Sequence, residues 1–191
     1  ARSATLQRGV KPPEPIPARP NTNPSRYNPL DALINETTSG MQLYVGNQSA
    51  ASSEQILKQH KIRYVVNCTH GGTKIPDYFH GKKFEGKTIH YLEFPVSHWT
   101  MHVNQIDPSS VLAFVQPLFD FIDEAWRKKS SVLVHCLAGA HRAGTTGTLC
   151  LMHYCNLKPS MAIKTAKACR PVIDPIGMLP ALLDKYDAAV N

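Results

Sequence analysis

The sequence predicts an α/β fold with a central, mostly parallel sheet and helices on both of its faces. Short β-branched runs alternate along the chain with longer segments of helical periodicity, which is the pattern of strand-helix-strand units. Of the 191 residues, 42% are hydrophobic and 18% are charged, a composition that suits one globular domain with an additional tail.

Residues 1–37 differ in composition from the rest of the chain. Seven prolines, at positions 12, 13, 15, 17, 20, 24 and 29, alternate there with polar residues. Such a segment forms no packed core, so we predict a Pro-rich extended arm or linker over residues 1–37, with docking to a protein partner as the alternative. The folded domain is predicted over residues 38–191.

The domain opens with two predicted strands and a short helix between them. Residues 42–45 are typical of a strand that ends in a turn, and Ser52 or Ser53 is placed to cap the helix that follows. Residues 62–67 form the second predicted strand. A third is predicted over residues 87–94, after a loop that carries glycine and lysine.

The second half of the domain is predicted to be mainly helical. A long helix over residues 109–128 carries apolar side chains at helical spacing, and a strand at residues 131–134 follows it directly. An apolar helix that ends near Asn156 and two further helices, over residues 160–169 and 178–190, complete the fold.

The segment VLVHCLAGAHRAGTTG, residues 132–147, is the most informative of the chain. A β-branched strand delivers Cys136 into a loop of small residues that ends at Arg142, where a helix is predicted to begin. Backbone N–H groups of such a loop point into one anion-binding concavity, and the helix dipole adds positive potential there. The predicted phosphate contacts are Leu137, Ala138, Gly139, Ala140, His141 and Arg142.

Two side chains of this loop have predicted chemical roles. Helix N-termini and cationic neighbours lower the pKa of a thiol from about 8.5 to roughly 3.5–7.5, so we expect a thiolate nucleophile at Cys136. Arg142 can bind two phosphate oxygens at once through its planar guanidinium, which lysine cannot do. His135 is expected to orient the loop and support the thiolate, while His141 either touches the substrate or shapes the loop.

The residues His135, Cys136, Gly139 and Arg142 form the pattern H-C-x-x-G-x-x-R. With this signature, the chain resembles the atypical dual-specificity branch of the cysteine-based protein tyrosine phosphatases. The resemblance extends over about residues 38–189, through GMQLYVGNQSAAS, IRYVVNCT, FVQPLFDFIDEAW and RPVIDPIGMLPALLDKY. It implies the compact dual-specificity phosphatase fold, a shallow pocket, a cysteinyl-phosphate intermediate, and no metal or organic cofactor.

The resemblance also implies a general acid, and here the chain departs from the family. The family places an aspartate in the loop between the strand that ends near Pro95 and the following long helix, and Asp107 is the only acidic residue there. Asp107 fits the role of a helix N-cap equally well. His98 stands where the family often has its acid, after a Pro-Val pair, and is the rival proton donor.

A second departure follows Arg142, where the family commonly has a serine or threonine whose hydroxyl stabilises the departing thiolate. This chain has Ala143, and Thr145 or Thr146 is the candidate replacement. We therefore expect slow breakdown of the phosphoenzyme.

Composition limits the remaining function classes. The chain has no run of eighteen apolar residues and no apolar signal core near its start, so we expect no membrane span. Five cysteines without paired short spacings indicate a reducing compartment, the cytoplasm or the nucleus. We interpret Cys150, His153 and Cys155 as part of a buried helix rather than a metal site. The net charge of +7 favours an anionic partner.

The predicted function is hydrolysis of phosphotyrosine, and of phosphoserine or phosphothreonine, in phosphorylated protein substrates. Two alternatives stay open. The altered acid loop and Ala143 also fit a pseudophosphatase that binds phosphopeptides or acts as a scaffold. Lys82, Lys83 and Lys87 leave open a non-protein polyanion such as a phosphoinositide, a phosphoglucan or RNA, although nucleic acid is not the expected partner.

Overall fold

The structure is a computed structural model that describes residues 13–17, 28–70, 74–104, 106–107 and 109–191. Most of the predicted Pro-rich arm, residues 1–12 and 18–27, lies outside this described part. Among the described residues, no helix has the length and apolar character that crossing a membrane requires.

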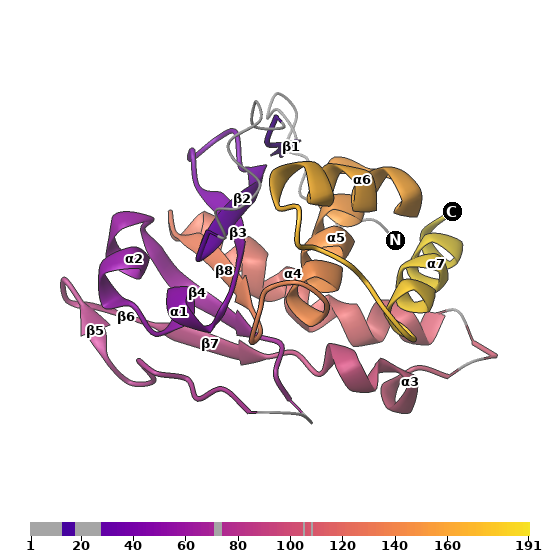
Figure 1. Cartoon of the computed structure of the whole chain (residues 1–191), viewed down its shortest axis with the longest axis horizontal. Coiled ribbons are helices and arrows are strands. Elements are labelled where there is room, and N and C mark those ends of the chain that lie inside the picture. Colours follow the sequence, from indigo (N-terminus) through magenta and orange to yellow (C-terminus); the bar gives the residue numbers. More distant parts are fainter. Residues whose placement is uncertain (1–12, 18–27, 71–73, 105, 108) are drawn as a thin grey trace.

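A six-stranded sheet forms the centre of the fold, in the order β1-β2-β3-β8-β4-β7 (Figure 1). Strands β3, β8, β4 and β7 run parallel to one another, and β2 and β1 extend this core antiparallel at one edge. The mostly parallel sheet predicted from the sequence is therefore confirmed. The strands are β1 (Glu14–Pro15), β2 (Leu30–Asn35), β3 (Gln42–Gly46), β4 (Ile62–Asn67), β7 (His90–Glu93) and β8 (Ser131–His135).

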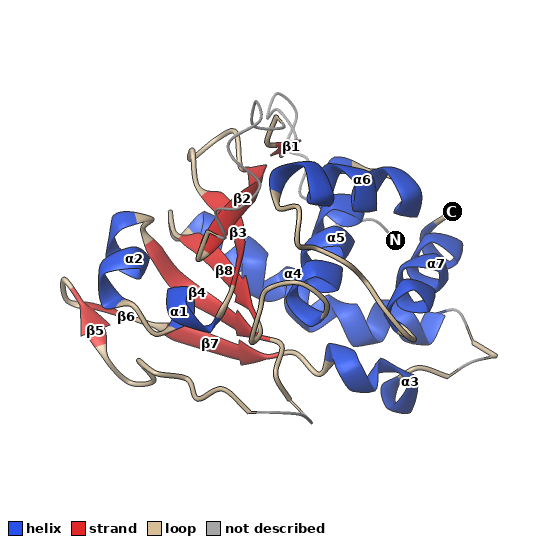
Figure 2. Cartoon of the chain, in the orientation of Figure 1, coloured by secondary structure: helices blue, strands red, loops and turns tan. Residues whose placement is uncertain are grey.

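Helices cover both faces of the sheet, as the sequence predicts. In Figure 2 the four longer helices gather on one side of the sheet, away from α1 and α2. The four are α4 (Ser109–Arg127), α5 (Arg142–Cys155), α6 (Pro159–Cys169) and α7 (Leu179–Val190). The shorter elements are α1 (Gln48–Ala51), α2 (Glu54–Gln59), the hairpin of β5 (Lys83–Phe84) and β6 (Lys87–Thr88), the 3₁₀ turn η1 (Val96–His98) and α3 (Trp99–His102).

Side chains along the buried strands point alternately to the two faces of the sheet and so contribute to both layers of the core. Val132 and Val134 of β8 point to the large cluster that the longer helices cover, whereas Leu133 between them joins the smaller cluster with Leu57 of α2. Successive side chains of a strand point to opposite faces, so one short strand anchors both layers. All five residues of β8 are buried, which fixes the position of the residue that follows it.

Two predicted elements differ in the structure. Residues 30–35, which composition places in the arm, form β2, and Leu33 and Ile34 are fully buried against the sheet. The folded part of the chain thus begins before residue 38, because the apolar run that follows Pro29 pairs with β3. The strand predicted over residues 87–94 is divided between β6, which turns back on β5, and β7, which pairs with β4.

The carboxyl ends of three parallel strands meet at one edge of the sheet. His135 of β8 is in register with Gly46 of β3 on one side and with Asn67 of β4 on the other. Open parallel sheets bind ligands beyond the carboxyl ends of their strands. The fold therefore places residue 136 at the centre of this edge.

Candidate active site

Cys136 leaves the end of β8 in a buried position and is 3% exposed. The backbone N–H of Gly139 donates a hydrogen bond to its sulfur at 3.2 Å. The loop that follows reaches the first residue of α5, Arg142, which is partly exposed. The structure thus brings the predicted nucleophile, the small-residue loop and the start of a helix together.

Four consecutive carbonyl groups of this loop are held from outside it. Leu137 O accepts from the N–H of Gln48 at 3.0 Å, and Ala140 O accepts from the N–H of Asp174 at 3.1 Å. Between them, the guanidinium of Arg170 donates to Ala138 O at 3.1 Å and to Gly139 O at 2.9 Å. In a trans peptide the N–H points opposite to the carbonyl of the preceding residue. Outward carbonyls at residues 137–140 therefore turn the N–H groups of residues 138–141 inward.

The side chains of the predicted phosphate contacts are small or exposed. Leu137 and Ala138 are exposed, whereas Gly139 and Ala140 are buried. Gly139 has φ +68°, a left-handed conformation that favours glycine. An α5 that begins at the loop supplies the N-terminal dipole expected for an anion site.

His141 is tied to a neighbouring segment. Its Nδ1 lies 2.6 Å from the carbonyl oxygen of Asp174, the residue whose N–H donates to Ala140. Of its two predicted roles, substrate contact and shaping of the loop, this contact supports the second.

Two buried groups beside Cys136 stay uncharged. Burial lowers the pKa of His135 to about 4, with Arg142 contributing and the backbone of Cys136 opposing. Burial raises the pKa of the Cys68 thiol to about 12, and Cys68 lies close enough to Cys136 for the two to interact electrostatically. His135 is thus a neutral imidazole at pH 7, and Cys68 a neutral thiol.

Asp107 caps α4 in the structure. Its carboxylate accepts from the backbone N–H of Ser109 at 2.9 Å and from the Ser109 hydroxyl at 2.7 Å. These hydrogen bonds hold the pKa of the exposed carboxyl below its usual value. Asp107 lines a small hollow with Val111 of α4 and with Lys185 and Ala188 of α7, and none of residues 136–142 lines that hollow. Of the two roles predicted for Asp107, the structure supports the cap, because the fold does not bring this side chain to the loop.

His98 lies at the end of η1, which packs against α5. Its Nδ1 is buried and has no hydrogen-bond partner in the described part of the chain. Its ring meets the ring of His70 edge-on, at 6.2 Å between centroids. The fold therefore keeps His98, rather than Asp107, beside the helix that carries Arg142.

A small charged cluster adjoins His98, and no local sequence pattern indicates it. Glu93, at the end of β7, lies 3.1 Å from Lys74 Nζ and 3.4 Å from His70 Nδ1. The hydrogen bond from Lys74 is the main cause of a lowered pKa for Glu93, and His70 contributes. These residues come from two separate parts of the chain, so only folding brings them together.

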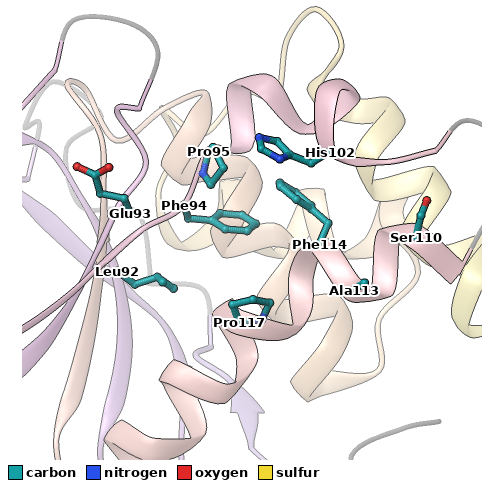
Figure 3. Close-up of a pocket in the computed structure, with 9 residues that line it drawn as sticks. All are labelled: Leu92, Glu93, Phe94, Pro95, His102, Ser110, Ala113, Phe114 and Pro117. Carbon is teal, nitrogen blue, oxygen red and sulfur yellow. The ribbon is translucent and has the colours of Figure 1, made fainter.

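A groove lies beside this region, between the end of β7 and α4 (Figure 3). Phe114 forms its wall, with its ring 5.0 Å from that of Phe94 and 5.6 Å from that of His102. None of residues 136–142 lines it. The groove is therefore separate from the cysteine loop.

The three residues that were considered as metal ligands, Cys150, His153 and Cys155, lie in α5. Cys150 is fully buried, and the His153 ring stacks on Phe119 at 3.7 Å and is hydrogen bonded to the Tyr186 hydroxyl at 2.7 Å. The interpretation as a buried helix is confirmed. All five cysteines are free thiols.

The parallel sheet delivers a buried cysteine into a loop whose N–H groups point inward, and an arginine stands at the start of the next helix. This arrangement defines the class of α/β domains with a cysteine phosphate loop. The sequence matches the dual specificity phosphatase catalytic domain over residues 43–187. The chain belongs to the dual specificity phosphatase family.

Relatives and solved structures agree with this assignment. The chain is 33% identical to human dual specificity protein phosphatase 7 over 145 residues, which cover 74% of this chain and 31% of the relative. For human dual specificity protein phosphatase 6 the identity is 31%, over 74% of this chain and 34% of the relative. The chain thus spans about a third of the length of these curated relatives.

Among solved structures, human DUSP28 superposes with a TM-score of 0.58 at 23% identity, covering 85% of this chain and 95% of that one. A mouse putative dual specificity phosphatase complexed with zinc tungstate gives 0.59 at 22% identity, covering 89% and 93%. Both show that the fold is that of dual specificity phosphatases.

Proposed function

We propose that this chain is a phosphatase that hydrolyses phosphotyrosine, and phosphoserine or phosphothreonine, in proteins through a cysteinyl-phosphate on Cys136. One observation carries the proposal: the carbonyls of residues 137–140 are all held outward, so the N–H groups of the loop converge in front of a buried cysteine. A converging set of N–H groups at a helix N-terminus suits a phosphate dianion.

In the first step, the thiolate of Cys136 attacks phosphorus. An S–P bond forms, the P–O bond to the leaving group breaks, and a general acid gives that oxygen a proton. Arg142 binds two of the phosphoryl oxygens and matches the charge that spreads over them. In the second step, water attacks phosphorus, the S–P bond breaks, and inorganic phosphate and the thiolate are released.

His98 is the proton donor that we favour. Its segment packs against α5, whereas Asp107 is exposed at the start of α4 and is engaged by Ser109. Nδ1 of His98 has no hydrogen-bond partner in the described part of the chain, so no contact at that nitrogen fixes the tautomer of the ring. An imidazole can serve as acid in the first step and as base toward water in the second.

Phosphoproteins are the favoured substrate class. The loop exposes Leu137 and Ala138 to a substrate, with no lysine among residues 136–142 for a second phosphate. The lysines on which the polyanion alternative rests lie in or next to the β5–β6 hairpin, which is at the far left of Figure 1 and distant from the β8–α5 connection; they are Lys82, Lys83 and Lys87. The free thiols suit a reducing compartment, so we expect the protein to act in the cytoplasm or the nucleus.

The proposal is tested by steady-state hydrolysis of an activated aryl phosphate and of a phosphotyrosine peptide. The parent is expected to cleave both, and Cys136→Ser neither. Cys155→Ser is the matched control, because Cys155 ends the same helix at its opposite terminus. A parent that binds phosphopeptide and cleaves neither substrate is a binding module, and the phosphatase proposal then fails.

A further inference from the structure

We infer that Arg170 and Asp31 are positioning residues for the phosphate-binding loop, and that the chain segment before the matched catalytic domain thereby holds this loop in its binding conformation. The inference rests on the proposed function of the loop, and it assigns a role to residues that make no contact with a substrate. Arg170 is the C-cap of α6, and Asp31 belongs to β2.

The guanidinium of Arg170 links the loop to the N-terminal segment. On one side, Nε and Nη2 donate to the carbonyls of Gly139 and Ala138. On the other, Nη1 lies 2.7 Å from the Asp31 carboxylate and donates to the carbonyl of Asn28 at 3.0 Å. Arg170 is 1% exposed and Asp31 is 5% exposed, so both charges are buried.

These contacts fix the direction of the N–H groups that would bind phosphate. The peptide plane that directs Ala138 O toward Arg170 directs the N–H of Gly139 the opposite way, and that N–H donates to the sulfur of Cys136. The next plane, held through Gly139 O, turns the N–H of Ala140 inward in the same manner. One guanidinium therefore orients two successive donors around Cys136.

Only arginine supplies this geometry. Its planar fork carries donors in several directions at fixed angles, whereas the ammonium of lysine is a single compact donor on a flexible stem. Asp31 offsets the buried positive charge, and removal of one partner from a buried pair leaves the other uncompensated. Asn28 and Asp31 precede residue 43, where the match to the catalytic domain begins, so the domain depends on residues outside that match.

The test compares Arg170→Lys, Asp31→Asn and Leu57→Ala with the parent protein over the full chain. Leu57 is fully buried against the opposite layer of the core, so Leu57→Ala destabilises the fold without touching the loop. Three quantities are measured: kcat and KM for an activated aryl phosphate, protection of Cys136 from iodoacetate by inorganic phosphate, and the thermal unfolding midpoint.

We expect kcat/KM to fall roughly 10- to 100-fold in Arg170→Lys and Asp31→Asn, since small displacements of positioned groups cost rates of this order. Protection by phosphate should weaken in the same two variants. Leu57→Ala should lose thermal stability and keep both loop properties at a temperature where it is folded. A substitution that merely loosened the fold would change the unfolding midpoint alone.

The inference is overturned by a folded Arg170→Lys or Asp31→Asn protein whose kcat/KM and phosphate protection both stay within about twofold of the parent. If one variant does not fold, the other decides. Protection of Cys136 by phosphate can be measured without turnover. This readout therefore distinguishes failure of the positioning role of Arg170 and Asp31 from failure of the proposed phosphatase function. A parent that cleaves nothing, yet loses phosphate protection in the variants, contradicts the proposed function and supports the role of Arg170 and Asp31.

Discussion

Gly139 packs directly against the backbone of Gly46: a Cβ at position 139 would lie 2.5 Å from the carbonyl oxygen of Gly46 and 2.9 Å from Nη2 of Arg170. The same residue has φ +68°. Both the conformation and the space therefore require glycine at this point of the loop. The contact also joins the end of β3 to the loop that follows β8.

Gly139→Ala should remove most of the activity. The added methyl group meets backbone atoms that cannot move without displacing the loop from Arg170, so we expect a loss in kcat/KM of about 100-fold or more. The matched control is Gly177→Ala, where φ is +60° and nothing lies within 4 Å of the position that the added methyl group would take. That variant should lose about 1 kcal/mol of stability and little activity. Equal activity in the two variants contradicts the role of close packing at Gly139.

His98→Gln should impair cleavage of poor leaving groups selectively. Loss of a general acid costs roughly 10²- to 10⁴-fold on such substrates, so the rate on a phosphotyrosine peptide should fall by that range and the rate on an activated aryl phosphate much less. Asp107→Asn is the comparison, and we expect it to retain both peptide activity and the cap of α4, because asparagine caps a helix about as well as aspartate. If Asp107→Asn instead loses activity selectively on the phosphotyrosine peptide, then Asp107, and not His98, is the general acid.

Ala143→Ser should accelerate breakdown of the phosphoenzyme. Ala143 is fully buried in the first turn of α5, and the predicted replacements are engaged elsewhere: the Thr145 hydroxyl donates to His141 O at 2.7 Å and the Thr146 hydroxyl to Arg142 O at 3.0 Å. A new hydroxyl near the departing thiolate is worth about 1.5 kcal/mol, or about tenfold in rate. Pre-steady-state kinetics should show a burst in the parent that shrinks in Ala143→Ser. A parent without a burst contradicts slow breakdown.

His153→Gln should flatten the acid side of the stability profile. Burial lowers the pKa of His153 to about 4, so the unfolded chain binds a proton more readily than the folded one. The parent therefore loses stability as the pH falls from about 6.5 to 4, by no more than about 3 kcal/mol for this group. Glutamine can keep the hydrogen bond to Tyr186 without titrating. Urea unfolding at several pH values measures the slope, with exposed His80→Gln as control, and an unchanged slope in His153→Gln contradicts the assignment.

The sequence predicts the elements whose signals are local. Residues 62–67 and 131–134 are recognisable because β-branched runs are bounded by turns, and Ser53 because its side chain caps α2 by accepting from the N–H of Ile56. The sequence does not predict strand β2, because the prolines that precede it give the whole segment the composition of an extended arm. Its place in the sheet depends on pairing with β3, which composition does not reveal.

The candidate site likewise has one part that the sequence shows and another part that only the fold shows. The spacing of Cys136 and Arg142 within one loop is local, and the sequence shows it directly. Arg170 and Asp31 are separated by 139 positions, so their contact appears only in the folded chain. The choice between Asp107 and His98 is also one of long-range placement, since an aspartate before a helix has the same local pattern whether it caps or catalyses.

Trapping of the covalent intermediate tests the central claim most directly. The parent is mixed with an activated aryl phosphate, quenched within milliseconds to seconds, and digested, and the phosphate is located by mass spectrometry. We expect up to one phosphate per chain, on the peptide that contains Cys136, and none in Cys136→Ser. Turnover without phosphate on Cys136, or activity that survives in Cys136→Ser, would contradict the cysteinyl-phosphate mechanism.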